Sequence, residues 1–178
     1  DSLQIQESRV NTLINLAAVL KEMGNTIEAK DYYLQALESQ KEGEGNVIKA
    51  TIYLNLGDLL EINNEWNEAL ETYENAAKIY ADQQMSKGLS ETYHGLARTY
   101  AGLDSKTLAE KYFKLCLELK REINDSLNIG EVLTSLAVFQ YENGRYDKAL
   151  KNYRQGLQLA KRFELPQLSR ANLLGLSE

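Results

Sequence analysis

Hydrophobic and polar residues follow one another in this chain with the spacing of amphipathic helices, and residues 54–77 are the clearest example. This stretch, LNLGDLLEINNEWNEALETYENAA, reads as two helices joined by a polar turn at residues 63–64. The small residues Gly57, Ala69 and Ala76 fall where two such helices must approach closely. The stretch therefore predicts a helical hairpin.

The same pattern returns every forty residues, over four full units and the start of a fifth. Matching residues stand in five columns at that spacing: Leu16, Leu56, Leu96, Leu136 and Leu176; Ala17, Gly57, Ala97, Ala137 and Ser177; Ala29, Ala69, Ala109 and Ala149; Tyr33, Tyr73, Phe113 and Tyr153; and Ala36, Ala76, Cys116 and Gly156. Amphipathicity fixes hydrophobic spacing within one helix but not residue identity at so long an interval. The chain is therefore predicted to be an array of repeats.

Each unit runs through large apolar, small, large apolar, alanine, aromatic and small residues, and this order resembles the tetratricopeptide repeat. The resemblance covers residues from about 6 to 178. The chain departs from the family at two positions. The opening Trp of the family is replaced by Leu13, Tyr53, Tyr93 and Leu133, and its closing Pro is replaced by Lys41, Ala81, Arg121 and Lys161. Longer units without that Pro resemble the long-repeat branch of the family, found in regulatory scaffolds and bacterial signalling proteins.

The resemblance implies an all-α fold, a right-handed superhelical solenoid of antiparallel helix pairs in which residues 1–178 form one array. The repeats are expected at about 6–45, 46–85, 86–125 and 126–165, with a partial repeat or capping helix at 166–178. Helices are predicted at roughly 2–23, 27–42, 46–62, 65–82, 86–102, 104–122, 126–143, 145–163 and 166–177. The short connections between them require neighbouring helices to be antiparallel.

The helix starts and the last helix carry further predictions. Asn46, Ser86 and Ser126 are expected to cap helices through their side chains, and Pro166 to start one through its preset backbone angle. The last helix has a partly polar outer face, made of Gln167, Ser169, Arg170 and Asn172. A capping helix and the start of another repeat both stay open. Because the chain begins at Asp1 rather than Met and stops within a fifth unit, a segment excised from a longer array is favoured.

Composition narrows the function classes. The net charge of −6 and the lack of a basic run argue against nucleic-acid binding, which depends mainly on clustered Lys and Arg. There is no stretch of about 18 apolar residues and no signal-peptide pattern. We therefore expect no membrane insertion and favour a cytoplasmic location. Because the chain begins with Asp1 rather than Met, removal of an N-terminal leader stays open.

The residues that usually carry catalysis are scarce. The sequence has no glycine-rich phosphate loop, no His-Glu-x-x-His and no Gly-x-Ser-x-Gly. Its single cysteine excludes an internal disulfide and a cysteine-rich metal site. A nucleophile and base pair would need His94 to meet Cys116, but Cys116 stands in a column of small packing residues, which indicates an inert buried thiol. We therefore expect no enzyme, no metal and no cofactor.

The resemblance implies a binding groove instead, because the first helix of each tetratricopeptide pair lines the concave side. Carried over position by position, the groove residues are Ile14, Asn15, Ala18, Leu54, Asn55, Asp58, His94, Gly95, Arg98, Thr134, Ser135 and Val138, with Lys21, Glu22, Glu61, Glu91, Glu131 and Glu142 at the helix ends. The candidate peptide-binding residues are Asn15, Asn55, Asp58, Glu91, His94, Arg98, Glu131 and Thr134. Carboxamides can both donate to and accept from a peptide backbone.

Part of this set matches the carboxylate clamp by which some relatives hold chaperone tails. His94 and Arg98 match its basic pair and Asn55 its central asparagine, but Ile14 and Ala18 stand where the clamp needs Lys and Asn. A chaperone-tail receptor is therefore disfavoured, and His94 is expected to be a solvated groove residue without special duty.

Acidic residues outnumber basic ones in the predicted groove, so its field favours a peptide or protein ligand that carries Lys or Arg. Three function classes stay open at this point. The leading one is a protein-interaction module with a peptide-binding concave groove. The second is a ligand-responsive sensor segment of a larger signalling protein, and the third is a structural spacer or self-association array.

Overall fold

The computed structural model describes residues 2–40 and 46–177, and within these ranges the chain is all-α with no strand. The helices are α1 Ser2–Glu22, α2 Thr26–Glu38, α3 Asn46–Ile62, α4 Trp66–Asp82, α5 Ser86–Gly102, α6 Lys106–Glu122, α7 Ser126–Glu142, α8 Tyr146–Arg162 and α9 Pro166–Ser177. The predicted fold class is confirmed, and the predicted bounds agree within two residues except at the end of α2. That helix ends at Glu38, and the predicted end at residue 42 lies outside the described residues.

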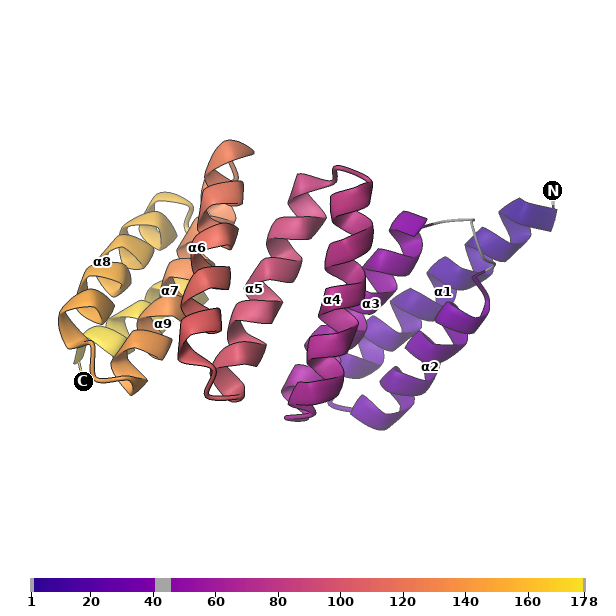
Figure 1. Cartoon of the computed structure of the whole chain (residues 1–178), viewed down its shortest axis with the longest axis horizontal. Helices are drawn as coiled ribbons and strands as arrows, with labels where there is room; N and C mark the ends of the chain where they lie inside the picture. The colour runs from indigo at the N-terminus through magenta and orange to yellow at the C-terminus, as the bar shows by residue number, and fades with distance from the viewer. Residues whose placement is uncertain (1, 41–45, 178) are drawn as a thin grey trace.

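The helices stack in chain order as antiparallel pairs, from α1 and α2 at the N-terminal end to α7, α8 and α9 at the other (Figure 1). Among the described residues, the odd-numbered helices contact one another, whereas the even-numbered helices contact only their neighbours in the sequence. The odd-numbered helices therefore lie on the inner, concave side of the solenoid, as the resemblance implies.

One type of turn joins successive helices, and it recurs every twenty residues. Its middle residue has a positive φ, and the described examples are Gly24, Asn64, Gln84, Asp104, Asn124, Gly144 and Glu164. In each turn the next residue donates its N–H to a carbonyl five residues earlier, as from Glu65 to Leu60 and from Met85 to Tyr80, both at 2.8 Å. These bonds satisfy carbonyls at the helix end. Each 40-residue unit from α3 onward thus consists of two 17-residue helices and two three-residue turns.

The predicted serine caps are wrong. Ser86 and Ser126 are the first residues of α5 and α7, as the predicted bounds have it, so the cap position falls on the residue before each of them. The cap positions belong to Met85, which makes no side-chain bond, and to Asp125, whose carboxylate accepts from the Asn128 N–H at 3.5 Å.

The last helix also departs from prediction at Asn172, which was placed on a polar outer face. Asn172 is fully buried, and its amide bonds with Thr134 on α7 and donates to the Leu168 carbonyl at 2.8 Å. The helix packs closely on α8 here, because a Cβ on Gly156 would lie 2.6 Å from the Asn172 side-chain oxygen. The remaining polar residues of α9 are exposed or half-buried.

The junctions between helix pairs are not equivalent, and one column of the repeat explains the difference. Gly95 on α5 and Gly175 on α9 let the rings of Tyr73 and Tyr153 lie against the helix backbone; a Cβ there would come within 2.4 and 2.3 Å of the ring. In α7 the same column holds Ser135, which has a side chain. Accordingly, α5 packs on α4, and α9 on α8, more extensively than α7 packs on α6.

Candidate functional site

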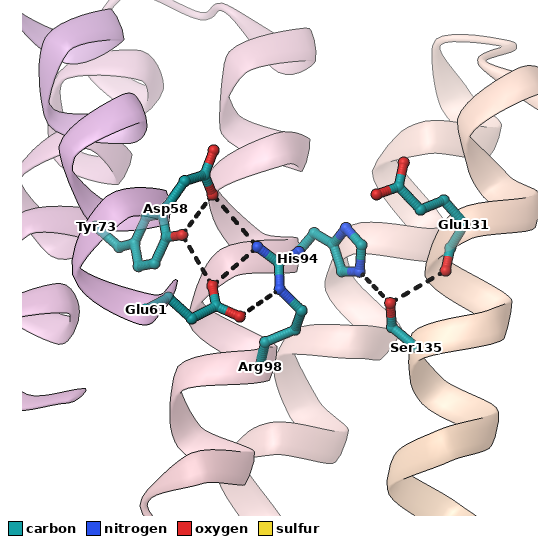
Figure 2. A network of polar contacts seen from close by, with 7 residues as sticks. All are labelled: Asp58, Glu61, Tyr73, His94, Arg98, Glu131 and Ser135. Atoms are coloured by element: carbon teal, nitrogen blue, oxygen red, sulfur yellow. Dashed lines mark hydrogen bonds and ion pairs between the residues drawn. The ribbon is translucent and has the colours of Figure 1, made fainter. Parts of the chain in front are cut away.

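A network of charged groups on the concave side joins α3, α4 and α5 through Arg98 (Figure 2). Arg98 donates from Nε and Nη2 to the two carboxylate oxygens of Glu61, at 2.6 and 2.9 Å. Its Nη2 also lies 3.3 Å from Asp58 Oδ1. The Tyr73 hydroxyl lies 2.6 Å from Asp58 Oδ1 and 3.1 Å from Glu61 Oε2. Because Asp58 and Glu61 are three residues apart on α3, both side chains face the same partners.

The electrostatics of this network shift the pKa values of Arg98 and Tyr73. Desolvation alone would lower the pKa of Arg98, but its hydrogen bonds to Glu61 and the nearby carboxylate charges outweigh this and raise the pKa. Burial, followed by the charges of Asp58 and Glu61, raises the pKa of Tyr73. Arg98 is therefore a half-buried cation that stays charged, and its charge is already paired with carboxylates of the chain.

A cavity of about 280 Å³ lies beside this network. Its lining residues are Leu54, Asn55 and Asp58 of α3, Glu91, His94 and Arg98 of α5, Lys120 of α6, and Asn128 and Glu131 of α7. A second hollow of about 400 Å³ shares Asp58, Arg98 and Glu131 with it and extends to Lys21 of α1 and Trp66 of α4. The two hollows form a groove that runs along the inner helices.

The cavity has a net negative charge because its cations are paired and two of its carboxylates are not. Arg98 is paired with Glu61, and Lys120 donates to Asp125 at 3.0 Å. Neither Glu91 nor Glu131 forms an ion pair within the described parts of the chain. A low-dielectric wall strengthens the field of such unpaired charges.

His94 lies at the base of this site and is almost completely buried, with 7% of its surface exposed. Its Nε2 lies 3.0 Å from Ser135 Oγ on α7, and its ring packs on Phe113 with 6.2 Å between centroids. Burial, followed by the positive charges of Arg98 and Lys120, holds the pKa of His94 well below its ordinary value. The expectation of a solvated residue is therefore wrong, because α6 and α7 cover the ring.

Six of the eight candidate residues line this one cavity, namely Asn55, Asp58, Glu91, His94, Arg98 and Glu131. The other two do not line it. Asn15 is exposed on α1, and Thr134 points toward α9, where its hydroxyl bonds with Asn172 at 2.8 and 3.1 Å. Whether any of the eight contacts a ligand stays a prediction.

Sequence reasoning missed Lys120, which lines the cavity from an outer helix. Its column holds Tyr80 and Ala160, both buried, and Lys120 itself is only 2% exposed. A lysine in a buried column indicates a carboxylate partner, which here is Asp125 in the next turn. Asp125 also accepts from the Asn128 side chain at 2.9 Å, so Asn128 reaches the cavity as part of the same cluster.

Cys116 lies in the core, and burial raises the pKa of its thiol to about 12. Within residues 2–40 and 46–177, no three His, Cys, Asp or Glu side chains lie together as metal ligands. In the same ranges, no helix has the length and apolar character to cross a membrane.

Comparison with solved structures shows the fold at low sequence identity. A Rap protein complexed with Competence and Sporulation Factor has a TM-score of 0.84 and 15% identity, over 92% of this chain and 46% of that one. BtubC (BKLC) from P. vanneervenii has a TM-score of 0.83 and 21% identity, over 99% and 73% of the two chains. Aspartyl phosphate phosphatase F from Bacillus subtilis has a TM-score of 0.81 and 18% identity, over 95% and 46%.

Comparison of sequences identifies the family. Tetratricopeptide repeat protein 29 of Homo sapiens is 27% identical over 151 residues, and that of Macaca fascicularis is 27% identical over 124 residues. These alignments cover 84% and 68% of this chain but only 31% and 26% of the relatives, so the chain spans under a third of their length. The tetratricopeptide-repeat family itself matches residues 8–82, 49–122 and 88–162. Since these matches together extend from residue 8 to residue 162, the chain belongs to the tetratricopeptide-repeat family.

Proposed function

We propose that this chain is a protein-interaction module that binds a peptide or protein segment in the groove along α3, α5 and α7. The observation that carries the proposal is the cavity of about 280 Å³, because six residues expected at ligand-facing positions line it together. Carboxamide, carboxylate and imidazole groups side by side suit an extended backbone with polar side chains. One chain with this fold was solved with another molecule bound, Competence and Sporulation Factor, which supports the use of such an array as a receptor.

The ligand should carry basic residues. Both cations of the cavity are paired with carboxylates of the chain, which leaves the charges of Glu91 and Glu131 available to a ligand. Such a field speeds the association of a cationic ligand and fixes its orientation more than it raises affinity.

A second candidate, the ligand-responsive sensor, is favoured by the position of the cavity at the α6–α7 junction, which is less extensive than the α4–α5 and α8–α9 junctions. Cavity residues on α3 and α5 precede that junction, and those on α7 follow it. A ligand held by both sides would restrict the angle between the two parts of the array. The ligand would shift the equilibrium between two shapes of the solenoid only to the extent that it binds one shape more tightly than the other.

The test compares partner capture from source-cell extract by the chain and by a Glu91→Lys, Glu131→Lys variant. The matched control is Glu71→Lys, Glu122→Lys, because both residues are exposed on outer helices and form no ion pair with described residues. Circular dichroism checks that the variants fold equally well. We expect the groove variant alone to lose a partner, whose binding should also weaken at high salt.

Three outcomes would contradict the proposal. If all proteins capture the same partner, the partner does not bind in the groove. If binding is insensitive to both salt and charge reversal, the field of the cavity has no role. If nothing is captured and the mass in solution rises with concentration, the self-association array becomes the better explanation.

A further inference from the structure

The hydrogen bonds around His94 offer an arrangement that places the ring proton on Nε2. Ser135 Oγ lies 3.2 Å from the Glu131 backbone carbonyl, one turn earlier in α7, and can donate its single proton to it. The same oxygen lies 3.0 Å from His94 Nε2, and Figure 2 marks both contacts. In this arrangement Ser135 accepts from Nε2, and in the neutral ring Nδ1 keeps an unprotonated lone pair.

That lone pair has no partner in the part of the chain that the structure describes. Nδ1 lies on the side of the ring away from Ser135 (Figure 2), and His94 lines the cavity. Burial and the charges of Arg98 and Lys120 disfavour a proton on the ring, which leaves it neutral near pH 7. A donor within the cavity can satisfy this lone pair.

The unpaired charges that line the cavity are carboxylates. Glu91 and Glu131 form no ion pair within the described residues, whereas the charges of Arg98 and Lys120 are paired with Glu61 and Asp125. The field of the cavity therefore favours a ligand that brings positive charge together with hydrogen-bond donors.

We propose that the cavity binds a primary ammonium group, such as a lysine side chain of a bound peptide, through His94 Nδ1 and the carboxylates of Glu91 and Glu131. An ammonium carries three N–H donors around one nitrogen, which suits acceptors from three side chains on two helices. A guanidinium is planar and pairs best with a single carboxylate. The inference deepens the proposed function and rests on it only for the source of the ammonium.

The experiment uses the fact that His94 is the only histidine of the chain. Protein labelled with ¹⁵N in histidine alone gives one pair of ring signals, and these report the tautomer directly. The chain is titrated with n-butylammonium, n-butylguanidinium or butyrate at constant ionic strength and pH 7. We expect an unprotonated Nδ1 in the free protein and a saturable shift of its signal with n-butylammonium only, or with n-butylammonium most tightly.

Variants separate this site from general attraction by an acidic surface. Glu91→Gln with Glu131→Gln should weaken n-butylammonium binding by about tenfold or more, whereas Glu71→Gln on α4 should leave it unchanged. Ser135→Ala removes the acceptor for Nε2, so it should produce a mixture of tautomers as well as weaker binding. This change of tautomer is a readout that a merely structural role of Ser135 would not alter.

The proposal is overturned if the free protein has its proton on Nδ1, or if n-butylguanidinium or butyrate binds as tightly as n-butylammonium. It is also overturned if Glu71→Gln weakens binding as much as the double variant does. If the capture experiment finds a partner that needs Glu91 and Glu131, but the His94 signal does not respond to n-butylammonium, this inference is wrong and the proposed function stands. If n-butylammonium binds saturably but the capture experiment finds no partner, the ammonium site stands and the proposed function is wrong.

Discussion

Replacing Gly95 with alanine tests the close packing that joins α4 to α5. The added Cβ would lie 2.4 Å from Tyr73 Cζ and 2.8 Å from its hydroxyl oxygen, well inside contact distance. The ring cannot move away freely, because it is fully buried and its hydroxyl is held by Asp58 and Glu61. The substitution therefore forces either the helices or the hydroxyl out of place.

Three contributions set the size of the effect. Overpacking costs about 1–3 kcal/mol, and losing a hydrogen bond to a charged group costs about 1.5–3 kcal/mol. Alanine is favoured over glycine within a helix by about 1 kcal/mol, which offsets part of this cost. We expect the free energy of unfolding to fall by about 2–4 kcal/mol.

The assay is urea unfolding followed by circular dichroism, with stability compared at equal m-values. Gly130→Ala on α7 is the matched control, because its Cβ would meet Leu168 Cδ2 at 3.2 Å and Leu159 Cβ at 3.3 Å. Rotation of the Leu168 side chain relieves the first contact, and a shift of α8 by a few tenths of an ångström relieves the second. Its effect should stay within about 1 kcal/mol. In a Tyr73→Phe background the cost of Gly95→Ala should shrink, because the hydroxyl bonds are already gone. If Gly95→Ala is as stable as Gly130→Ala, the reasoning about this junction is refuted.

Four further predictions concern single side chains. Folding lowers the pKa of His94, so its contribution to the free energy of unfolding is complete above the unfolded pKa of about 6.5 and is lost as pH falls through the folded pKa. The urea midpoint should therefore fall with pH in that range, and His94→Gln should make this fall smaller. Arg98→Met leaves the carboxylates of Asp58 and Glu61 unpaired and should lower the free energy of unfolding by about 1–3 kcal/mol. Adding Glu61→Gln should recover part of that loss, and a double variant no more stable than Arg98→Met would contradict the pairing. Cys116 should react with a thiol reagent at about pH 8 only after unfolding, and rapid reaction of the native protein would contradict its burial. Ala69→Leu should cost about 1–3 kcal/mol in thermal or urea unfolding, because its site is fully buried, and a neutral effect would indicate unfilled space there.

The sequence was sufficient for the helices and for the face that lines the groove, because both follow from local periodicity. Ala17, Ala97 and Ala137 are buried at the same position of the repeat, so the residues around them fall on the concave side without any tertiary information. The serine caps failed for a related reason: the turns place residues such as Gln84 and Glu164 at positive φ, which their residue types do not favour.

The charge network was beyond sequence reasoning, because its pairs join residues far apart in the chain. Arg98 is 37 residues from Glu61 and 40 from Asp58, and sequence spacing alone cannot distinguish a cation that is free to bind a ligand from one already paired. The same uncertainty applied to His94, whose burial depends on how α6 and α7 cover it. Lys120 was the exception, since its place in a buried column was a readable signal.

A single column of the repeat links the packing of this array to its binding site. Where that column holds Gly95 or Gly175, a tyrosine ring fits against the helix and the adjoining helix pairs pack extensively. Where it holds Asn55 or Ser135, a polar side chain takes the position; Asn55 lines the cavity and Ser135 contacts His94. Glycine in this column therefore favours close packing, and a polar residue leaves room for a site. From α3 to α9 the two kinds alternate, and the polar groups of the cavity lie beside the α6–α7 junction, which is less extensive than the α4–α5 and α8–α9 junctions.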